Sequence, residues 1–368
     1  DPVQAPTTPA HPMTLKRGWP ILAALTLATA VVTVDNTVLN VALPSIARDL
    51  RAGNGELQWI GNAYSLLFGG LLLTGGNLAD RFGRKRVLLS GLVGFAAASA
   101  LVVFVHGAVE LIALRALIGA AAAFVMPSTL ALMFRVFEGP TRQAAMGLWG
   151  AVAGIGFVAG PLLGGVILDH FSWHAVFLVN VPIASVALLA AAFTVPESAD
   201  PTGARADLVG TVLSVATMGT FVYALVTGPD AGWTSSQVLA SGACFLAALA
   251  AFVSWELHTA HPMLPLQFLR CSAFAGPAAA EGVLMFSAFG SLFLLTQLLQ
   301  LVDGDSPLQA GICTAPIAAG TIASGVVGMR TARRFGAHVS CATGFVFGAI
   351  GLGILALGVT HGYLPLAI

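Results

Sequence analysis

Long apolar runs alternate with short polar or charged segments along the whole chain. Each run is long enough for a helix of about 20 residues, the length that crosses the hydrocarbon core of a bilayer. Bounded by Gly, Pro or charged residues, the runs predict eleven spans, at 20–43, 57–79, 87–106, 109–134, 143–168, 174–195, 208–228, 236–257, 273–301, 308–329 and 339–360. A shorter stretch at 362–368 has the pattern of the start of a twelfth. The pattern therefore predicts an all-α polytopic membrane protein.

Composition excludes several other classes of protein. Hydrophobic residues make up 57% of the chain and charged residues only 9%, whereas a soluble domain carries about 25% charged residues. The net charge is zero, so no basic field favours nucleic acid as a partner. The four cysteines have no metal-ligand spacing, and no phosphate-binding loop or hydrolase elbow is present. We therefore expect neither an enzyme nor a protein with a metal or another cofactor.

The basic residues predict the orientation. With the N-terminus in the cytoplasm, Arg48 and Arg51 lie outside, Arg115 lies within a span, and all other Lys and Arg lie inside. The inside set is Lys16, Arg17, Arg81, Arg84, Lys85, Arg86, Arg135, Arg142, Arg205, Arg270, Arg330, Arg333 and Arg334. Cytoplasmic loops carry an excess of such residues. We expect a multi-pass protein of the cell (plasma or inner) membrane with a cytoplasmic N-terminus.

The spacing of the spans predicts four parts. Residues 1–19, rich in Pro, Thr and Ala, are expected to form a disordered cytoplasmic tail. Residues 20–195 form a six-helix bundle, 196–270 a linker with two extra spans, and 271–368 the first part of a second bundle.

A degenerate repeat supports two related bundles. Arg334-Phe335-Gly336 after the tenth span repeats Arg81-Phe82-Gly83 after the second, with Arg333 in place of Asp80 and Met329 in place of Gly76.

Charged residues inside apolar spans are functional candidates, and three occur: Asp35, Arg115 and Glu281. Counted along the helices at about 1.5 Å per residue, Asp35 and Arg115 reach similar depths in the bilayer. They are expected to pair, either as a static structural ion pair or as a proton-coupling pair in which proton binding depends on the distance to the guanidinium. Glu110 and Glu256 lie at span ends and are expected at the interface.

Glu281 falls near the midplane of the ninth span, and the visible neighbouring spans offer it no basic partner. We predict that it binds a proton or a cationic substrate and lines a substrate cavity with Asn36 and Asn40. The alternative is a carboxyl group that faces a water-filled cavity without a role in transport.

Two further segments stand out. The connection from Gly76 to Arg86 carries five charges in a tight turn between two spans, as a topological anchor, a gate or both would require. Its candidate gate residues are Gly76, Asp80, Arg81, Gly83, Arg84 and Lys85. In the fifth span, the glycines that share one face predict close helix packing, and a proline favours a kink. This segment comprises Gly156, Gly160, Pro161, Gly164 and Gly165.

These segments resemble signatures of the major facilitator superfamily. The run from Gly76 to Lys85 resembles the loop between its second and third spans, and that from Gly156 to Gly165 resembles the antiporter motif of its drug:proton exchangers. Asp35-Asn36-Thr37-Val38-Leu39-Asn40-Val41-Ala42-Leu43-Pro44 is similar to the first span of the fourteen-span drug:proton antiporters. Arg115-x-x-x-Gly119 is similar to their fourth-span motif, and the run from Trp173 to Pro182 to the start of their sixth span, with His174 in place of Arg.

The resemblance implies two bundles that rock between inward-open and outward-open states. It implies that Asp80 locks the loop against the other bundle and that proton binding by Asp35 drives export of a hydrophobic or amphipathic drug. The expected partners are a small lipophilic substrate, protons and the lipid bilayer, and the expected oligomeric state is a monomer. A fourteen-span member has three more spans, so the chain is expected to be C-terminally truncated, as a fragment or as a paralogue. A facilitator or symporter for a small metabolite, and a non-transporting truncated membrane paralogue, are the alternatives.

Overall fold

The computed structural model describes residues 15–360 except 200–206, 261, 265 and 303. The described part contains helices and no strand. The first six spans are α1 (Leu15–Leu50), α2 (Asn54–Phe82), α3 (Arg84–Leu101) with a 3₁₀ turn (Val102–Phe104), α4 (Ala108–Val136), α5 (Gly139–His170), and α6 (His174–Leu178) with α7 (Asn180–Thr194). The remaining elements are α8 (Leu208–Ala231), α9 (Ser236–His258), a 3₁₀ turn (Leu266–Arg270), α10 (Ser272–Gln297) with a π turn (Leu298–Val302), α11 (Pro307–Phe335) and α12 (Ala337–Thr360).

Each of the eleven predicted spans corresponds to a helix or to a pair of consecutive helices, but several ends were wrong. Helix α1 starts at Leu15, inside the segment 1–19 that was predicted as a tail, and it continues past Pro44 to Leu50. Residues 1–14 and the predicted twelfth span at 362–368 lie outside the described residues. The sixth span is interrupted after Leu178. Pro182 lacks an N–H, so the carbonyl of Leu178 four residues earlier loses its helical hydrogen bond, while Val179 between the two helices keeps helical dihedrals.

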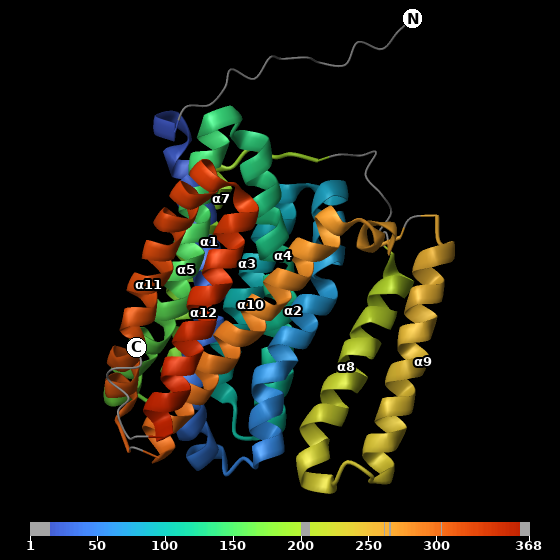
Figure 1. Cartoon of the computed structure of the whole chain (residues 1–368), viewed down its shortest axis with the longest axis vertical. Helices are drawn as coiled ribbons and strands as arrows, with labels where there is room; N and C mark the ends of the chain where they lie inside the picture. Colours follow the sequence, from blue (N-terminus) through green and yellow to red (C-terminus); the bar gives the residue numbers. More distant parts are fainter. Residues whose placement is uncertain (1–14, 200–206, 261, 265, 303, 361–368) are drawn as a thin grey trace, which may run out of the picture.

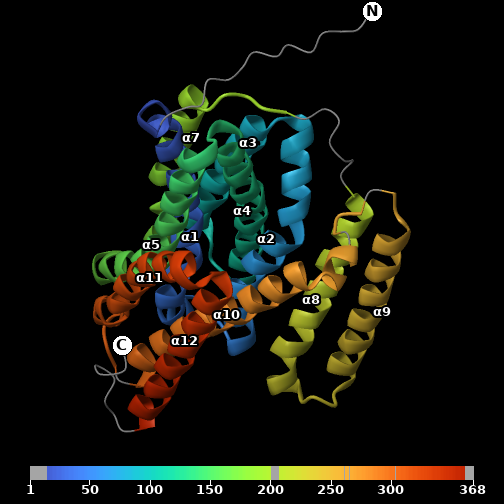
Figure 2. The same cartoon turned by 45° about the horizontal axis from the view of Figure 1, so that its top comes forward.

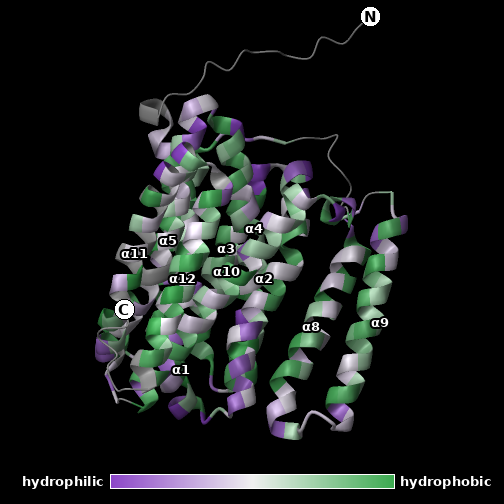
Figure 3. Ribbon diagram, in the orientation of Figure 1, coloured by the Kyte–Doolittle hydropathy of each residue, from purple (hydrophilic) through white to green (hydrophobic). Residues whose placement is uncertain are grey.

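Within the part of the chain that the structure describes, nine helices are long and apolar enough to cross a membrane. Helices α2 and α11 are not among them, although each has 29 residues. Helix α2 carries Gln58, Asn62 and Asn77, and α11 carries arginines near its end. In Figure 3 hydrophilic residues gather at helix ends and also run along the lower half of α2. A polar face on a helix of this kind is the expected lining of an internal cavity.

The first six spans form the main core, and α8, α10 and α11 pack against it (Figures 1 and 2). The largest buried cluster contains, among others, Leu22, Leu25, Ile46, Leu92, Phe95, Leu111 and Phe177, all from α1–α6. Helix α5 packs against α1 and also against α11, while α8 packs against α2 and α9. A second, smaller core joins α10 to α11 through Leu295, Leu299 and Ala310. The first bundle therefore has the larger buried core, and the candidate site is built within it.

The repeat detected in the sequence is also a repeat of backbone geometry. Gly83 (φ 107°) joins α2 to α3 and Gly336 (φ 92°) joins α11 to α12, each as a single residue between two helices. The left-handed region is open to Gly without steric cost. The arginine before each junction lies over the neighbouring Phe ring, at 5.3 Å from Arg81 to Phe82 and 5.2 Å from Arg334 to Phe335. Two structurally equivalent helix junctions therefore occur, one in each predicted bundle.

The glycine face of α5 is a close helix contact, as the spacing predicted. Gly156, Gly160 and Gly164 lie against Thr33, Thr37 and Val38 of α1, respectively. A Cβ at Gly160 would overlap the Thr37 side chain and come within 2.8 Å of the Val38 backbone nitrogen. Because a backbone atom cannot move aside cheaply, this position requires glycine.

We therefore expect Gly160→Ala to destabilise the protein by about 1–3 kcal/mol, the usual cost of overpacking. The matched control is Gly150→Ala in the same helix, where an added Cβ meets nothing within 4 Å. Thermal unfolding of the two variants in detergent provides the measurement. Equal melting temperatures would show that α1 and α5 tolerate separation at this point.

Candidate functional site

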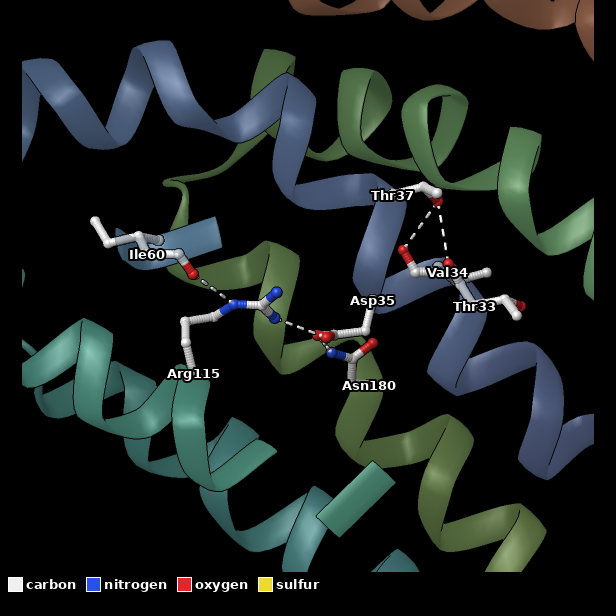
Figure 4. Close-up of polar contacts among 7 residues, drawn as sticks. All are labelled: Thr33, Val34, Asp35, Thr37, Ile60, Arg115 and Asn180. Carbon is white, nitrogen blue, oxygen red and sulfur yellow. Dashed lines mark hydrogen bonds and ion pairs between the residues drawn. The ribbon is translucent and has the colours of Figure 1, made fainter. Parts of the chain in front are cut away.

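Asp35 of α1 and Arg115 of α4 form an ion pair inside the first bundle (Figure 4). Arg115 Nη1 lies 2.7 Å from Asp35 Oδ2, and the side chains are 1% and 0% exposed. The predicted juxtaposition is confirmed, whereas the proton-coupling role is not tested by the geometry. In a medium of low dielectric, neither charge is stable without the other.

Polar neighbours complete the pair. Asn180 Nδ2, at the first residue of α7, donates to Asp35 Oδ1 at 2.6 Å, and Arg115 Nε donates to the carbonyl oxygen of Ile60 at 3.2 Å. The guanidinium also lies over two aromatic rings, 4.5 Å from the centroid of Tyr64 and 5.9 Å from that of Phe177. Such cation–π contacts stabilise a desolvated arginine. The site thus draws on α1, α2, α4, α6 and α7.

Close helix packing fixes the backbones that carry the pair. Thr33 and Thr37, two residues to either side of Asp35, face the glycines of α5, and Thr37 Oγ1 donates to the Gly156 carbonyl at 3.4 Å. One turn after Arg115, a Cβ at Gly119 would come within 2.8 Å of the Tyr64 backbone. Glycines at these contacts therefore set how closely α1 approaches α5 and α4 approaches α2, the helices that carry Asp35 and Arg115.

A cavity of about 540 Å³ adjoins the pair from the side of Arg115. It lies in the half of the bundle toward the end of α1 and the start of α2, and α10 contributes Phe289 and Phe293. Its other lining residues are Asn36, Leu39, Asn40, Leu43, Leu57, Gln58, Gly61, Asn62, Ser65 and Arg115. The carboxamides and the apolar side chains together suit an amphipathic molecule. The placement of Asn36 and Asn40 in a cavity agrees with the sequence prediction.

Glu281 is not brought to this cavity. It lies exposed on α10, eight residues before Phe289, the first cavity residue of that helix. At 1.5 Å per residue this places it about 12 Å further along the helix axis. Glu281 is therefore not among the residues that line this cavity, and its predicted place in a substrate cavity with Asn36 and Asn40 stays a prediction. Its role in binding a proton or a cation stays a prediction.

The charged loop after α2 is clamped to the end of α7. Lys85 Nζ donates to the Ala192 carbonyl at 2.7 Å, and the Arg84 backbone N–H donates to the Ser198 carbonyl at 2.8 Å. The Glu197 carboxylate accepts from the Lys85 N–H at 3.2 Å and lies 3.5 Å from Arg86 Nε. The loop is thereby held by the last carbonyls of a neighbouring helix, where cations are favoured.

Asp80 pairs within the loop, where Arg84 is its hydrogen-bond and ion-pair partner in the part of the chain that the structure describes. Both Nε (2.8 Å) and Nη2 (2.7 Å) of Arg84 contact Asp80 Oδ1, and the two side chains are partly exposed. Gly76 makes only ordinary contact with Pro127, whereas its neighbour Gly75 lies tight against the Ala123 backbone of α4. The expected lock between Asp80 and the other bundle is therefore not a contact of this conformation.

The two span-end carboxylates differ in exposure. Glu256, expected at the membrane interface, is covered by protein at 4% exposure, and its Oε2 accepts from the Leu264 N–H at 2.8 Å. Glu110 is exposed at the start of α4 and accepts from the His106 N–H at 2.7 Å, in keeping with an interfacial position. The chain after α9 folds back over Glu256 within eight residues, which span boundaries cannot indicate.

Sequence reasoning missed several site residues. Asn180 was noted only as part of a resemblance, and Tyr64, Phe177 and Glu197 were not singled out. Asn180 could have been found as an amide within an apolar run. Glu197 could have been found as an acidic residue that directly follows a span and lies near a basic loop. Nothing in the local sequence marks the two aromatic residues. Nearby, His174 stacks on Trp173 with ring centroids 3.7 Å apart.

Comparison with known proteins identifies the family. The family model described as Major Facilitator Superfamily matches residues 25–368. The chain belongs to the major facilitator superfamily. This family consists of membrane transport proteins, so the chain is classed with multi-pass transporters and not with enzymes.

Two relatives are identical to the chain at 33% and 39% of the aligned positions. The multidrug efflux pump LfrA of Mycolicibacterium smegmatis is 39% identical over 351 residues, which cover 95% of this chain and 69% of LfrA. The tetracenomycin C resistance and export protein of Streptomyces glaucescens is 33% identical, over 87% of this chain and 60% of that protein. The chain thus spans between 60% and 69% of the length of these two relatives.

Solved structures support the fold alone. A peptide transporter POT in complex with sulfate aligns with a TM-score of 0.64 at 15% identity, covering 94% of this chain and 77% of the other. The proton:xylose symporter XylE aligns with a TM-score of 0.58 at 13% identity, covering 88% and 70%, respectively. Both agree with the all-helical major facilitator fold described above.

The buried pair predicts a specific double-mutant result. Arg115→Leu leaves the Asp35 carboxylate without its cation and should destabilise the protein by about 3–5 kcal/mol. Asp35→Leu combined with Arg115→Leu removes both charges and should restore most of this loss, because apolar replacement of a buried ion pair is often neutral. Thermal unfolding in detergent compares the single and double variants. Additive losses would contradict mutual neutralisation.

Proposed function

We propose that this protein is a secondary active exporter that exchanges protons for hydrophobic or amphipathic drugs by alternating access. The single observation that carries the proposal is the buried Asp35–Arg115 pair beside a cavity lined by amides and apolar groups. A carboxylate whose charge is balanced only by a movable guanidinium is a group whose proton binding can change with conformation. The relatives' names, which include a multidrug efflux pump and an antibiotic export protein, favour export of such compounds.

Proton binding and substrate binding are adjacent in this scheme. Arg115 lines the cavity while it also holds Asp35. A proton that binds Asp35 removes the charge that Arg115 neutralises, so the ion pair weakens and the helices α1 and α4 are free to shift. A substrate in the cavity contacts the same arginine, which couples the two ligands through one side chain.

The topology and domain division belong to the same proposal. Residues 20–195 act as the first bundle, 196–270 as a linker with two extra helices, and 271–368 as part of the second bundle, in a fourteen-span arrangement with a cytoplasmic N-terminus. The clamp of the loop 83–86 on α7 supports an anchoring role for the basic loop at the cytoplasmic side. In a second conformation, Asp80 would exchange Arg84 for a partner on the other bundle.

The proposal predicts that Asp35→Asn abolishes proton-coupled efflux while membrane insertion stays normal, because an amide binds no proton at this site. The assay uses inverted membrane vesicles that contain the full-length protein. Ethidium is added to acidified vesicles, and the release of protons from the vesicle interior is measured. Asp169→Asn, an exposed carboxylate at the far end of α5, is the matched control. Proton release that survives in Asp35→Asn would overturn the coupling role, and transport without any proton dependence would indicate a facilitator.

The loop makes a separate prediction. Asp80→Ala removes the acceptor of Arg84 and should lower the transport rate roughly five- to tenfold through a shift between the two conformations, although it lies far from the cavity. Asp230→Ala, an exposed carboxylate at the end of α8, is the control. Efflux rates in the same vesicles decide the matter, and a normal rate in Asp80→Ala would reduce the loop to a topological anchor.

A further inference from the structure

Asn180 occupies a position that the proposed mechanism does not yet use. It is the first residue of α7, directly after the break between α6 and α7, and its side chain is 0% exposed. Its Nδ2 donates to Asp35 Oδ1 at 2.6 Å (Figure 4). The two oxygens of Asp35 are therefore divided between two donors, with Arg115 on Oδ2 and Asn180 on Oδ1.

The other end of the carboxamide is the informative atom. Among the residues that the structure describes, Asn180 Oδ1 is buried and accepts no hydrogen bond. An unpaired buried acceptor costs about 1–3 kcal/mol, so such an atom needs an explanation. A state of the site in which this oxygen is used would supply one.

The chemistry of the neighbours shows which state that is. When Asp35 binds a proton, a new O–H bond forms at the carboxyl group, and this hydroxyl needs an acceptor. Arg115 has only donors, so it cannot supply one. A carboxamide has both a donor and an acceptor, and half a turn about its Cβ–Cγ bond exchanges them.

Few other titratable or charged groups face Asp35. Arg115 comes from α4 and the buried Tyr64 from α2, and the Tyr64 ring lies against the guanidinium. Helix α7 has no titratable residue, the charged residues of α5 lie at its two ends, and His174 of α6 stacks on Trp173. On α10, Glu281 is exposed.

The geometry points to Asn180 as a positioning residue that serves both protonation states of Asp35. Its N–H group holds the carboxylate beside Arg115, and after rotation its carbonyl oxygen accepts the hydroxyl hydrogen of the carboxylic acid. The rotation gives the Asp35 oxygen a hydrogen-bond partner in both charge states, while the end of the amide that points away from Asp35 stays unpaired, as Oδ1 is in the present state. This role rests on the proposed proton-coupled function.

The test compares pH profiles of ethidium-driven proton exchange for wild type, Asn180→Asp, Asn180→Leu and Asp35→Asn in proteoliposomes of the complete protein. In Asn180→Asp two carboxyl groups share a proton, so the pH of half-maximal exchange should rise by about one unit or more. In Asn180→Leu both states lose a partner, and the rate should fall roughly tenfold. The control is Ser99→Ala, which removes a buried hydroxyl group that has no hydrogen-bond partner in the described structure. It should leave the exchange rate and its pH profile unchanged.

A second measurement keeps the inference testable if Asn180→Asp does not reach the membrane. The infrared band of the protonated Asp35 carboxyl group, assigned by its loss in Asp35→Asn, should shift in Asn180→Leu because the hydroxyl loses its acceptor. An unchanged profile in Asn180→Asp, or a wild-type rate and band in Asn180→Leu, would overturn the inference. Wild-type exchange with no proton dependence, or normal exchange in Asp35→Asn, would instead overturn the proposed function, and the inference with it.

Discussion

The ion pair between Asp35 and Arg115 is the interaction on which the rest of the first bundle depends. A lone charge in an apolar helical bundle is strongly unfavourable, and the cost is offset only when an opposite charge lies at hydrogen-bonding distance and the remaining polar atoms are also paired. The observed 2.7 Å contact meets the first requirement, and Asn180 and the Ile60 carbonyl pair further atoms of the two side chains, whereas Asn180 Oδ1 itself is left without a partner among the described residues. The same requirement makes the pair sensitive to any change in proton binding or in helix position.

The packing of the surrounding helices follows from this constraint. Helices α1 and α5 meet through glycines on one side and threonines on the other, and α4 approaches α2 at Gly119. Small residues allow backbones to approach closely, which fixes the distance between neighbouring helices. Asn180, the first residue of α7, reaches Asp35 with its side chain. The cavity lies on the other side of Arg115, so the charged pair lies between the packed core and the cavity.

Much of this was predictable from local sequence. Span positions follow from apolar runs, the meeting of Asp35 and Arg115 follows from counting residues inward from each membrane face, and the packing role of the α5 glycines follows from their four-residue spacing. The equivalence of the junctions at Gly83 and Gly336 was visible as a short repeat. What the sequence could not supply depended on contacts between distant segments. The burial of Glu256, the partners of the charged loop on α7 and the cavity-facing side of α10 are of this kind. Glu281 is an example. Its depth was estimated by counting residues along one helix, whereas the cavity is lined by residues of four helices.

The central claim is that substrate binding and proton binding at Asp35 are linked. Calorimetric titration of the complete protein in detergent with ethidium, carried out in buffers of different ionisation enthalpy, measures this linkage directly. The account predicts a buffer-dependent binding enthalpy that corresponds to release of about one proton per bound ethidium when Asp35 starts protonated. It also predicts that this dependence is lost in Asp35→Asn while ethidium still binds. A binding enthalpy independent of buffer in the wild-type protein, across the pH range in which exchange operates, would contradict the account.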